Sequence, residues 1–407
     1  MKKIFAFVPS TNRTEEVFMK IMFSAGEASG DLHGAGLAGA LRRLDPDIEL
    51  LGMGGELMRE AGVRIIYDIK NLGVIGVGEI IKKIPFFFKL RSFLVDTMAE
   101  ERPDALVCID YPGFNMRLIK KAKAAGIPVI YYILPTIWAW HKSRGETIAQ
   151  YTDLAVSLFP FEAAMYRELG TNVVYGGHPL LDTVHAEWTK DKAYEAFGLD
   201  ETKKTVVLMP GSRMQEVKGL FPQMLEAGRL IAEKTGNVQF IVPKATTIDR
   251  RVLQKLADTA ALPIVIGEDH VYDMMNIADA AVCASGTATL ETALMGLPTL
   301  LIYRVNTLTY LLSKILVHID NIGLPNIIEG RRVMPELWQN DVTPEKIASV
   351  IVPLLTEEAA HEEARRAMLA VRDKMGEPGA VMRTGEIILE FIKEIRLHEA
   401  VQQLGEL

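Results

Sequence analysis

The chain has 407 residues and a formal net charge of −7, a length that suffices for two domains and a charge that excludes a general nucleic-acid binder. Its two cysteines, Cys108 and Cys283, lie in apolar runs and are interpreted as buried small side chains in a reducing compartment, so neither a disulfide nor a zinc site is indicated. No apolar run reaches the roughly 18 residues that a transmembrane helix requires.

Residues 1–18 contain two lysines and a short apolar patch, but they lack the longer apolar core and the small-residue cleavage site of a secretory signal. Met19 has the character of a second chain start, directly before the first strand. We therefore expect residues 1–18 to be a disordered extension or the product of an upstream start-codon assignment.

Apolar strands alternate with helical segments along most of the chain, a pattern typical of βαβ units on parallel sheets. One series extends from a strand at residues 21–25 to another at 173–175. The alternation pauses at 176–183, which we interpret as a hinge, and it restarts near Val206. The sequence therefore predicts an α/β protein in which two Rossmann-like, doubly wound domains face a cleft, with C-terminal helices that cross back to the first domain.

A strand–turn–helix segment in the second series predicts an anion site. An apolar strand at 280–284 leads into Ser285, Gly286 and Thr287, and a helix follows. Small residues at a helix start let a phosphate approach the unpaired backbone N–H groups. Glu291 lies about one turn further, near enough to accept hydrogen bonds from a sugar hydroxyl. For this motif alone, an ordinary Ser N-cap is the alternative.

A second segment of the same kind lies upstream. The strand that starts at Thr205 ends in Pro210, Gly211 and Ser212, and Arg213 follows. Arginine offers a fixed fork of donors that suits phosphate. Taken singly, a surface arginine in a βα loop is the alternative, but the two segments together predict a site that holds a diphosphate without a metal.

Three carboxylates lie at the ligand-bearing ends of strands in the first series. Asp110 directly follows the strand at 106–109, where it can act as a general base toward a hydroxyl or cap the next helix, and its position favours neither role. Glu27 and Asp31 follow the first strand. They could bind substrate hydroxyls or a cationic group, or favour a helix N-terminus through its dipole.

The sequence also contains the acidic tripeptide Asp45-Pro46-Asp47, which matches the signature for a metal-held nucleotide sugar. It lies between a helix end and a strand start, on the opposite edge of the sheet, and we interpret it as a turn. We therefore expect no metal and no cofactor, with phosphate binding resting on Arg213 and helix dipoles.

Residues 74–90 read VIGVGEIIKKIPFFFKL and mix aliphatic side chains and three phenylalanines with lysines. This composition predicts a segment in a membrane interface, although a buried helix with a loop is the standard alternative. The expected membrane contacts are Val74, Ile75, Val77, Ile80, Ile81, Phe86, Phe87 and Phe88.

A series of short motifs occurs in order between about residues 20 and 390: SAGEASGD at 24–31, IDYPGFN at 109–115, WAW at 138–140, PFE at 160–162, GHP at 177–179, PGSR at 210–213 with Glu216, SGTATLE at 285–291 and LPN at 324–326. Together they resemble the lipid-A-disaccharide synthase family, glycosyltransferases of the two-domain GT-B type. Departures are confined to the Trp loop, at Leu134, Thr136 and His141.

The resemblance implies transfer of a diacylglucosamine from UDP to the 6-hydroxyl of 2,3-diacylglucosamine 1-phosphate (lipid X), with inversion, giving a β-1,6 disaccharide and UDP. It further implies the residue roles. These are Asp110 as the catalytic base; Ser212, Arg213, Ser285, Gly286, Thr287, Glu291 and Asn326 for the UDP-sugar donor; and Glu27, Ser29 and Asp31 on the acceptor side.

The same resemblance divides the chain into an acceptor and membrane-facing domain at 19–180, a UDP-sugar domain at 181–370 and a C-terminal helix at 371–407 that packs on the first domain. It implies a cytoplasmic protein that is peripheral on the inner face of the inner membrane. It does not decide whether the protein forms a homodimer. The alternatives are another UDP-sugar GT-B enzyme such as a lipid glucosyltransferase, a UDP-N-acetylglucosamine 2-epimerase, and a non-catalytic lipid-binding protein.

Overall fold

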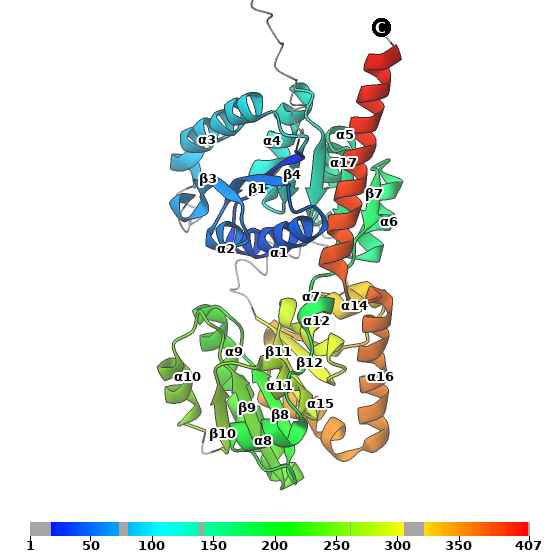
Figure 1. The fold of residues 1–407 in the computed structure, drawn as a ribbon. Helices are drawn as coiled ribbons and strands as arrows, with labels where there is room; N and C mark the ends of the chain where they lie inside the picture. The colour runs from blue at the N-terminus through cyan, green and yellow to red at the C-terminus, as the bar shows by residue number, and fades with distance from the viewer. Residues whose placement is uncertain (1–17, 73–79, 138–141, 261, 305–320, 406–407) are drawn as a thin grey trace, which may run out of the picture. The chain divides into compact units, whose positions relative to one another are not determined.

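The computed structural model describes residues 18–72, 80–137, 142–260, 262–304 and 321–405. These residues form two parallel β-sheets with helices between the strands (Figure 1). The extension predicted for residues 1–18 lies outside the described residues except for Phe18.

The first sheet has seven strands in the order β3-β2-β1-β4-β5-β6-β7. In chain order they are β1 (Lys20–Ala25), β2 (Glu49–Gly54), β3 (Arg64–Asp68), β4 (Ala105–Ile109), β5 (Val129–Tyr132), β6 (Leu154–Ser157) and β7 (Val173–Tyr175). The helical segments among them are α1 (Ala28–Leu44), α2 (Glu56–Glu60), the 3-10 turn η1 (Ile69–Leu72), α3 (Ile80–Glu101), α4 (Pro112–Ala124), α5 (Lys142–Tyr151) and α6 (Pro160–Glu168). Helices α1 and α2 lie on one side of the sheet and α3 and α4 on the other (Figure 1). The central strands are therefore apolar on both faces.

The second sheet has six strands in the order β10-β9-β8-β11-β12-β13. They are β8 (Lys204–Met209), β9 (Val238–Pro243), β10 (Ile264–Gly267), β11 (Ala280–Ala284), β12 (Thr299–Tyr303) and β13 (Glu336–Trp338). The remaining helices are α7 (Leu180–Thr183), α8 (Lys190–Phe197), α9 (Met214–Thr235), α10 (Arg250–Ala257), α11 (Val271–Asn276), α12 (Thr287–Leu294), α14 (Leu324–Glu329), the 3-10 turn η2 (Gln339–Asp341), α15 (Pro344–Thr356), α16 (Glu358–Met375) and α17 (Ala380–Gly405).

Each face of the second sheet has its own hydrophobic core. Val206 and Leu208 of β8 belong to the core that α9 and α15 complete, whereas Val207 belongs to the core that contains residues of α11. Successive side chains of a strand point to opposite faces, so a continuous apolar run fills both cores. The two Rossmann-like, parallel-sheet domains predicted from the sequence are confirmed.

The described chain divides into two compact units. Unit 1 contains the chain up to Tyr132, Tyr151–Asp153 and the chain from Gly385, and unit 2 contains the rest. Within unit 1, Gly385 of α17 lies against Ala40 of α1, and Arg396 of α17 forms an ion pair with Asp104 at 2.6 Å. The domain boundaries at 180 and 370 stay a prediction. None of the helices in the described part of the chain combines the length and apolar character that crossing a bilayer requires.

Candidate active site

Two loops leave the first sheet side by side. Strands β1 and β4 are parallel neighbours, and Ala25 is the register partner of Ile109. The loop with Glu27 and the residue Asp110 therefore emerge from the same edge of the sheet, where ligands of doubly wound folds collect. The acidic tripeptide at 45–47 lies at the other ends of the strands, and the backbone N–H of Asp47 donates to the Asp45 carboxylate as in a turn, which confirms our interpretation.

Asp110 adopts an unusual backbone conformation. Its φ is 48°, and that of Tyr111 is 50°, so two consecutive residues with side chains are left-handed. Each such residue costs about 1–2 kcal/mol. Tyr111 is the N-cap of α4, and no side chain caps this helix, so the capping role considered for Asp110 is not observed.

Buried polar groups hold the Asp110 turn in place. The Asp110 carbonyl accepts hydrogen bonds from Nδ2 of Asn115 and from the hydroxyl of Tyr131, both at 2.8 Å. Asn115 is fully buried and also binds Ser24, whose hydroxyl donates to Oδ1 of Asn115 at 2.6 Å. Opposite the turn, Gly26 lies so close to the Tyr111 ring that a Cβ there would overlap it. Gly26 is thus required by the approach of Tyr111.

The electrostatics of this edge favour protonated carboxyl groups. Burial raises the pKa of Asp110, and a hydrogen bond from the Tyr111 backbone opposes that rise. Burial also raises the pKa of Glu27, and the neighbouring charge of Asp110 adds to the effect. Glu27 is the N-cap residue of α1, but its side chain makes no capping bond. A carboxyl group with a raised pKa holds a transferred proton more readily than an ordinary one.

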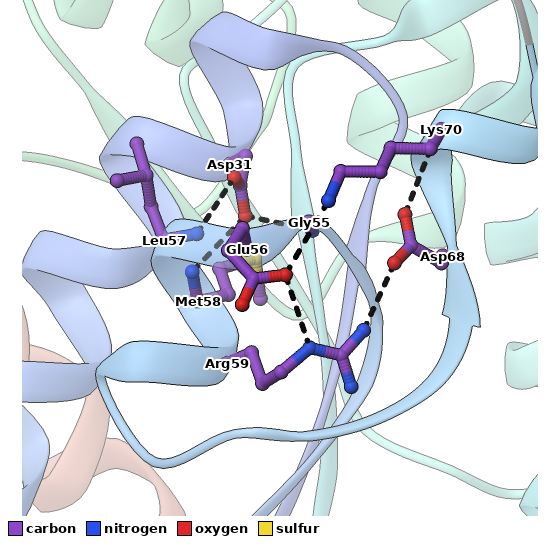
Figure 2. Close-up of polar contacts among 8 residues, drawn as sticks. All are labelled: Asp31, Gly55, Glu56, Leu57, Met58, Arg59, Asp68 and Lys70. Atoms are coloured by element: carbon purple, nitrogen blue, oxygen red, sulfur yellow. Dashed lines mark hydrogen bonds and ion pairs between the residues drawn. The ribbon is translucent and has the colours of Figure 1, made fainter.

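Asp31, in contrast, is committed to the protein itself (Figure 2). It is buried, and its carboxylate accepts hydrogen bonds from the backbone N–H groups of Gly55 at 2.7 Å, Leu57 at 3.1 Å and Met58 at 3.1 Å. These donors belong to the start of α2, which would otherwise leave them unpaired. Asp31 therefore fixes α2 on α1, and its acceptor-side role stays a prediction. Ser29 lies exposed in the first turn of α1.

Exposed ion pairs continue this network toward η1. Arg59 donates to Asp68 at 2.9 Å and to Glu56 at 3.4 Å, while the backbone N–H of Lys70 donates to Asp68 at 2.9 Å (Figure 2). Exposed pairs of this kind add at most about 1 kcal/mol each. Their contribution is to shape the end of β3.

The two anion loops predicted in the second sheet leave neighbouring strands. β8 and β11 are parallel, and Met209 is the register partner of Cys283. The loops at 210–213 and 285–287 therefore leave the same edge next to each other. Gly286 is exposed, and apart from its neighbours along the chain no described atom lies within 4 Å of the position that a Cβ would take there. The start of α12 is thus open to an anion.

The loop that carries Arg213 is shaped by Glu216. The Glu216 carboxylate accepts the backbone N–H groups of Ser212 and Arg213, both at 3.1 Å, and pairs with the Arg213 guanidinium at 2.9 Å. Gly211 has a φ of 108°, and a side chain there would overlap the Glu216 carboxylate. The Arg213 side chain is 80% exposed. An exposed ion pair contributes little to stability, so the Arg213 guanidinium can exchange its contact with Glu216 for a contact with a diphosphate.

Glu291 lies about one turn after the start of α12, as the sequence predicts. Burial raises its pKa, and a hydrogen bond from the Tyr272 hydroxyl at 3.3 Å partly opposes this. The pKa of Tyr272 rises to about 12, mainly through burial and then through the charge of Glu291. Tyr272 therefore stays a neutral donor over the physiological range, and it fixes one oxygen of Glu291.

Within the described residues, one cluster has the spacing of metal ligands: Glu187, His270 and Asp273. Asp273 is buried, and its Oδ1 accepts the backbone N–H groups of Glu187 at 2.9 Å and Trp188 at 2.8 Å. Its other oxygen lies 3.2 Å from Nδ1 of His270, the N-cap residue of α11. Hydrogen bonding within the protein accounts for the cluster.

Comparisons with known proteins assign the chain to a family. Residues 21–389 match the family model described as lipid-A-disaccharide synthetase. A lipid-A-disaccharide synthase from Geobacter sulfurreducens is 41% identical, over 93% of this chain and 99% of the relative. One from Syntrophus aciditrophicus is 42% identical, over 92% of this chain and 98% of the relative. The chain belongs to the lipid-A-disaccharide synthetase family. The resemblance drawn from its motifs is confirmed.

Solved structures share the fold of this synthetase family member at low sequence identity. A putative UDP-N-acetylglucosamine 2-epimerase from Listeria monocytogenes has a TM-score of 0.61 at 13% identity, covering 89% of this chain and 94% of that chain. A calicheamicin glycosyltransferase has a TM-score of 0.59 at 13% identity, covering 93% of this chain and 99% of that chain. These likenesses show a common architecture of two Rossmann-like domains, the GT-B type that the sequence predicts.

Asn326, which is expected to bind the donor, is fully buried in this family member, and its side-chain amide forms hydrogen bonds within the protein. Its Oδ1 accepts the backbone N–H groups of Val333 at 2.7 Å and Met334 at 2.8 Å. Its Nδ2 donates to the Met334 carbonyl at 2.8 Å and to Glu336 at 2.7 Å. Asn326 therefore holds the segment around α14 together, and direct contact with the donor stays a prediction.

The segment expected at the membrane is only partly described. Val74, Ile75, Val77 and the Trp loop at 138–140 lie outside the described residues, and Ile80 and Ile81 lie in the first turn of α3, where the side chains are not described.

The three phenylalanines of α3 differ in their surroundings. Phe86 contacts Tyr67, and Phe87 contacts Phe114, with ring centroids 6.4 and 6.3 Å apart. Phe88 is 53% exposed and lies under the Arg91 guanidinium. Phe114 in turn contacts Tyr111, so a row of aromatic rings connects α3 with the residue after Asp110.

Several polar side chains of the site carry no clear signal in the sequence. Asn115 belongs to the motif at 109–115, but nothing there shows that its amide reaches back to Ser24, 91 residues earlier. Tyr131 lies in an apolar strand, and the bond of its hydroxyl to Asp110 follows only from the pairing of β4 with β5. Tyr272 is likewise identified only by its contact with Glu291.

Proposed function

We propose that the protein is an inverting glycosyltransferase of lipid A biosynthesis. It transfers 2,3-diacylglucosamine from UDP to the 6-hydroxyl of 2,3-diacylglucosamine 1-phosphate and releases the β-1,6-linked tetraacyl disaccharide 1-phosphate and UDP. Membership of the lipid-A-disaccharide synthetase family supports this reaction. The structural observation that carries it is the placement of Arg213 and the open start of α12 on neighbouring parallel strands.

Asp110 serves as the base. It takes the proton of the acceptor 6-hydroxyl while the hydroxyl oxygen bonds to C1 of the donor sugar. The bond from C1 to the phosphate oxygen breaks, and its electron pair leaves with UDP. The raised pKa of Asp110 suits this role, because a base works best when its pKa approaches the operating pH.

The donor loops stabilise the leaving UDP. Negative charge grows on the diphosphate in the transition state. The guanidinium of Arg213 supplies positive charge, and the backbone N–H groups at the start of α12 supply hydrogen-bond donors, so no metal is needed. Glu291 accepts hydrogen bonds from the ribose hydroxyls. Ser212 and Thr287 lie in the same two loops and complete the donor contacts.

The acceptor and the membrane belong to the other sheet. Glu27 and Ser29 bind the acceptor sugar beside Asp110. Exposed apolar side chains of α3, Ile84 at 44%, Phe88 at 53% and Phe93 at 44%, insert into the interface where both diacylated substrates reside. Lys89 and Arg91 between them attract anionic head groups. We place the protein on the cytoplasmic face of the inner membrane as a peripheral enzyme.

The test is an incubation of the whole protein with both diacylated substrates, read by mass spectrometry. We expect the tetraacyl disaccharide 1-phosphate and equimolar UDP from the parent protein, and product formation that is slower by about 100-fold or more from Asp110→Asn. Unacylated UDP-N-acetylglucosamine, supplied alone, is the control. Its conversion to a 2-epimer, or transfer of an unacylated sugar to a lipid, would replace the proposal with one of its rivals.

A further inference from the structure

The proposed reaction needs a carboxylate at residue 110, but it does not require the backbone there to be left-handed. Asp110 and Tyr111 have φ values of 48° and 50°. Residues with a Cβ are strained in this region and stay there only where neighbouring groups hold them. The groups that hold Asp110 are therefore part of what positions its carboxylate.

Two donors from different elements converge on one atom. The Asp110 carbonyl oxygen accepts Nδ2 of Asn115, in α4, and the hydroxyl of Tyr131, in β5, each at 2.8 Å. A carbonyl oxygen has two lone pairs, so both are used. On the other side of the residue, the Asp110 N–H donates to the Tyr132 carbonyl at 3.2 Å. Both polar groups of the Asp110 backbone are thus bonded.

Asn115 cannot turn away from this arrangement without loss. Its Oδ1 accepts the Ser24 hydroxyl at 2.6 Å, and its Nδ2 also donates to the Ser24 carbonyl at 3.1 Å. Ser24 and Asn115 are both fully buried, so a rotated amide would leave unpaired polar atoms inside the protein. The amide ties the end of β1 to the residue that follows β4.

We propose that Asn115 and Tyr131 are positioning residues for Asp110, which set the location of its carboxylate by fixing the left-handed turn that carries it. The inference rests on the proposed function, because that function makes Asp110 the base. Neither residue touches substrate in this role. Their loss should therefore lower kcat and leave the affinity for UDP and the KM for the donor unchanged.

Tyr131→Phe is the clean test, because it removes one hydroxyl and keeps the buried ring. We expect kcat to fall about tenfold, the effect of one such hydrogen bond, while the affinity for UDP stays within about twofold. Burial raises the pKa of Asp110 in the parent protein. In the variant the carboxylate is no longer held in its buried position and becomes more hydrated, so its pKa should fall and the acid limb of the kcat/KM profile should move to lower pH. The control is Tyr194→Phe, which removes a hydroxyl that donates to the Ile277 carbonyl at 3.0 Å and should leave kcat unchanged.

A double variant separates positioning from a general loss of stability. If Tyr131 acts through Asp110, Tyr131→Phe should change the residual rate of Asp110→Asn by less than about twofold. An equal loss in both backgrounds, or a Tyr131→Phe protein with the parent kcat, overturns the positioning role and leaves the proposed function intact. A parent protein that does not join the diacylated substrates overturns the proposed function, and the positioning role with it.

Discussion

The hydroxyl of Tyr272 donates a hydrogen bond to the carboxylate of Glu291 at 3.3 Å. It links α11 to α12, the helix whose start forms one of the two anion loops. Burial raises the pKa of Glu291, so this carboxylate becomes protonated at a higher pH than an exposed glutamate.

This relationship predicts how UDP binding depends on pH. An ionised Glu291 accepts ribose hydroxyls, so the UDP affinity should fall as the pH drops through the raised pKa. Tyr272→Phe removes a bond that favours the ionised form, and it should move the fall to higher pH. Isothermal titration calorimetry with UDP across the pH range measures both. Glu291→Gln is the control: its affinity should be about tenfold lower and independent of pH in this range. A parent protein whose UDP affinity is equally flat would exclude Glu291 from the ribose contact.

Asp110→Asn should separate catalysis from folding. We expect a loss of turnover of about 100-fold or more, the usual contribution of a general base, with unchanged affinity for UDP. The pKa of Asp110 is raised in the fold, so the ionised carboxyl weakens the folded state once the pH rises through that value. Melting curves should therefore show Asp110→Asn gaining stability over the parent as the pH rises, and matching it in acid. Turnover within about tenfold of the parent would remove Asp110 as the base.

Arg213→Ala should weaken UDP binding by about ten- to 100-fold, as expected for a lost charge-assisted contact to phosphate. The affinity for uridine, which lacks the diphosphate, should not change. Stability should not change either, because Arg213 is 80% exposed and its pair with Glu216 is weak. Arg229→Ala is the matched control, since Arg229 is a half-exposed arginine further along α9 that pairs with Glu226 and Glu233 and lies away from the loop at 210–213. Equal losses for UDP and uridine would place Arg213 away from the diphosphate.

Asp31→Ala should act on stability. Three backbone N–H groups at the start of α2 lose their acceptor, which should lower the free energy of unfolding by about 2 kcal/mol. Chemical denaturation measures the change. Asp45→Ala, which removes a carboxylate with a single long hydrogen bond in an exposed turn, should cost far less. An undestabilised Asp31→Ala protein with a raised KM for the acceptor would return Asp31 to the acceptor side.

Replacements in α3 should separate membrane contact from packing. Changing Ile84 and Phe88 to Ser together should reduce binding to anionic vesicles without lowering stability, because both side chains are exposed. Phe87→Ser should lower the melting temperature, since this ring packs on Phe114. Leu57→Ser, at an exposed leucine of α2, is the control for surface apolarity. If the double variant still floats with vesicles at the parent level, α3 is not the membrane contact.

The residues expected to bind substrate or to act in catalysis divide into two groups. The role of the first group can be predicted from adjacent residues in the sequence, and the role of the second cannot. The loops at 210–213 and 285–287 could be predicted because a strand, small residues and a helix start form an anion site within one short segment. Asp31 and Asn326 could not be placed this way. Their side chains reach backbone groups elsewhere, at Gly55 for Asp31 and at Val333 for Asn326, and sequence position alone does not show whether a polar group faces substrate or protein.

The sequence by itself determined that this protein is built from two parallel-sheet domains and which residue types meet at their strand ends, because buried strands, helix stops and phosphate loops each need characteristic residues in a local order. Only the tertiary structure decided how those side chains are used. The left-handed Asp110, held by Asn115 and Tyr131, is the clearest case. Its conformation depends on hydrogen bonds that exist only after β4, β5 and α4 have packed together, and no stretch of sequence contains that information.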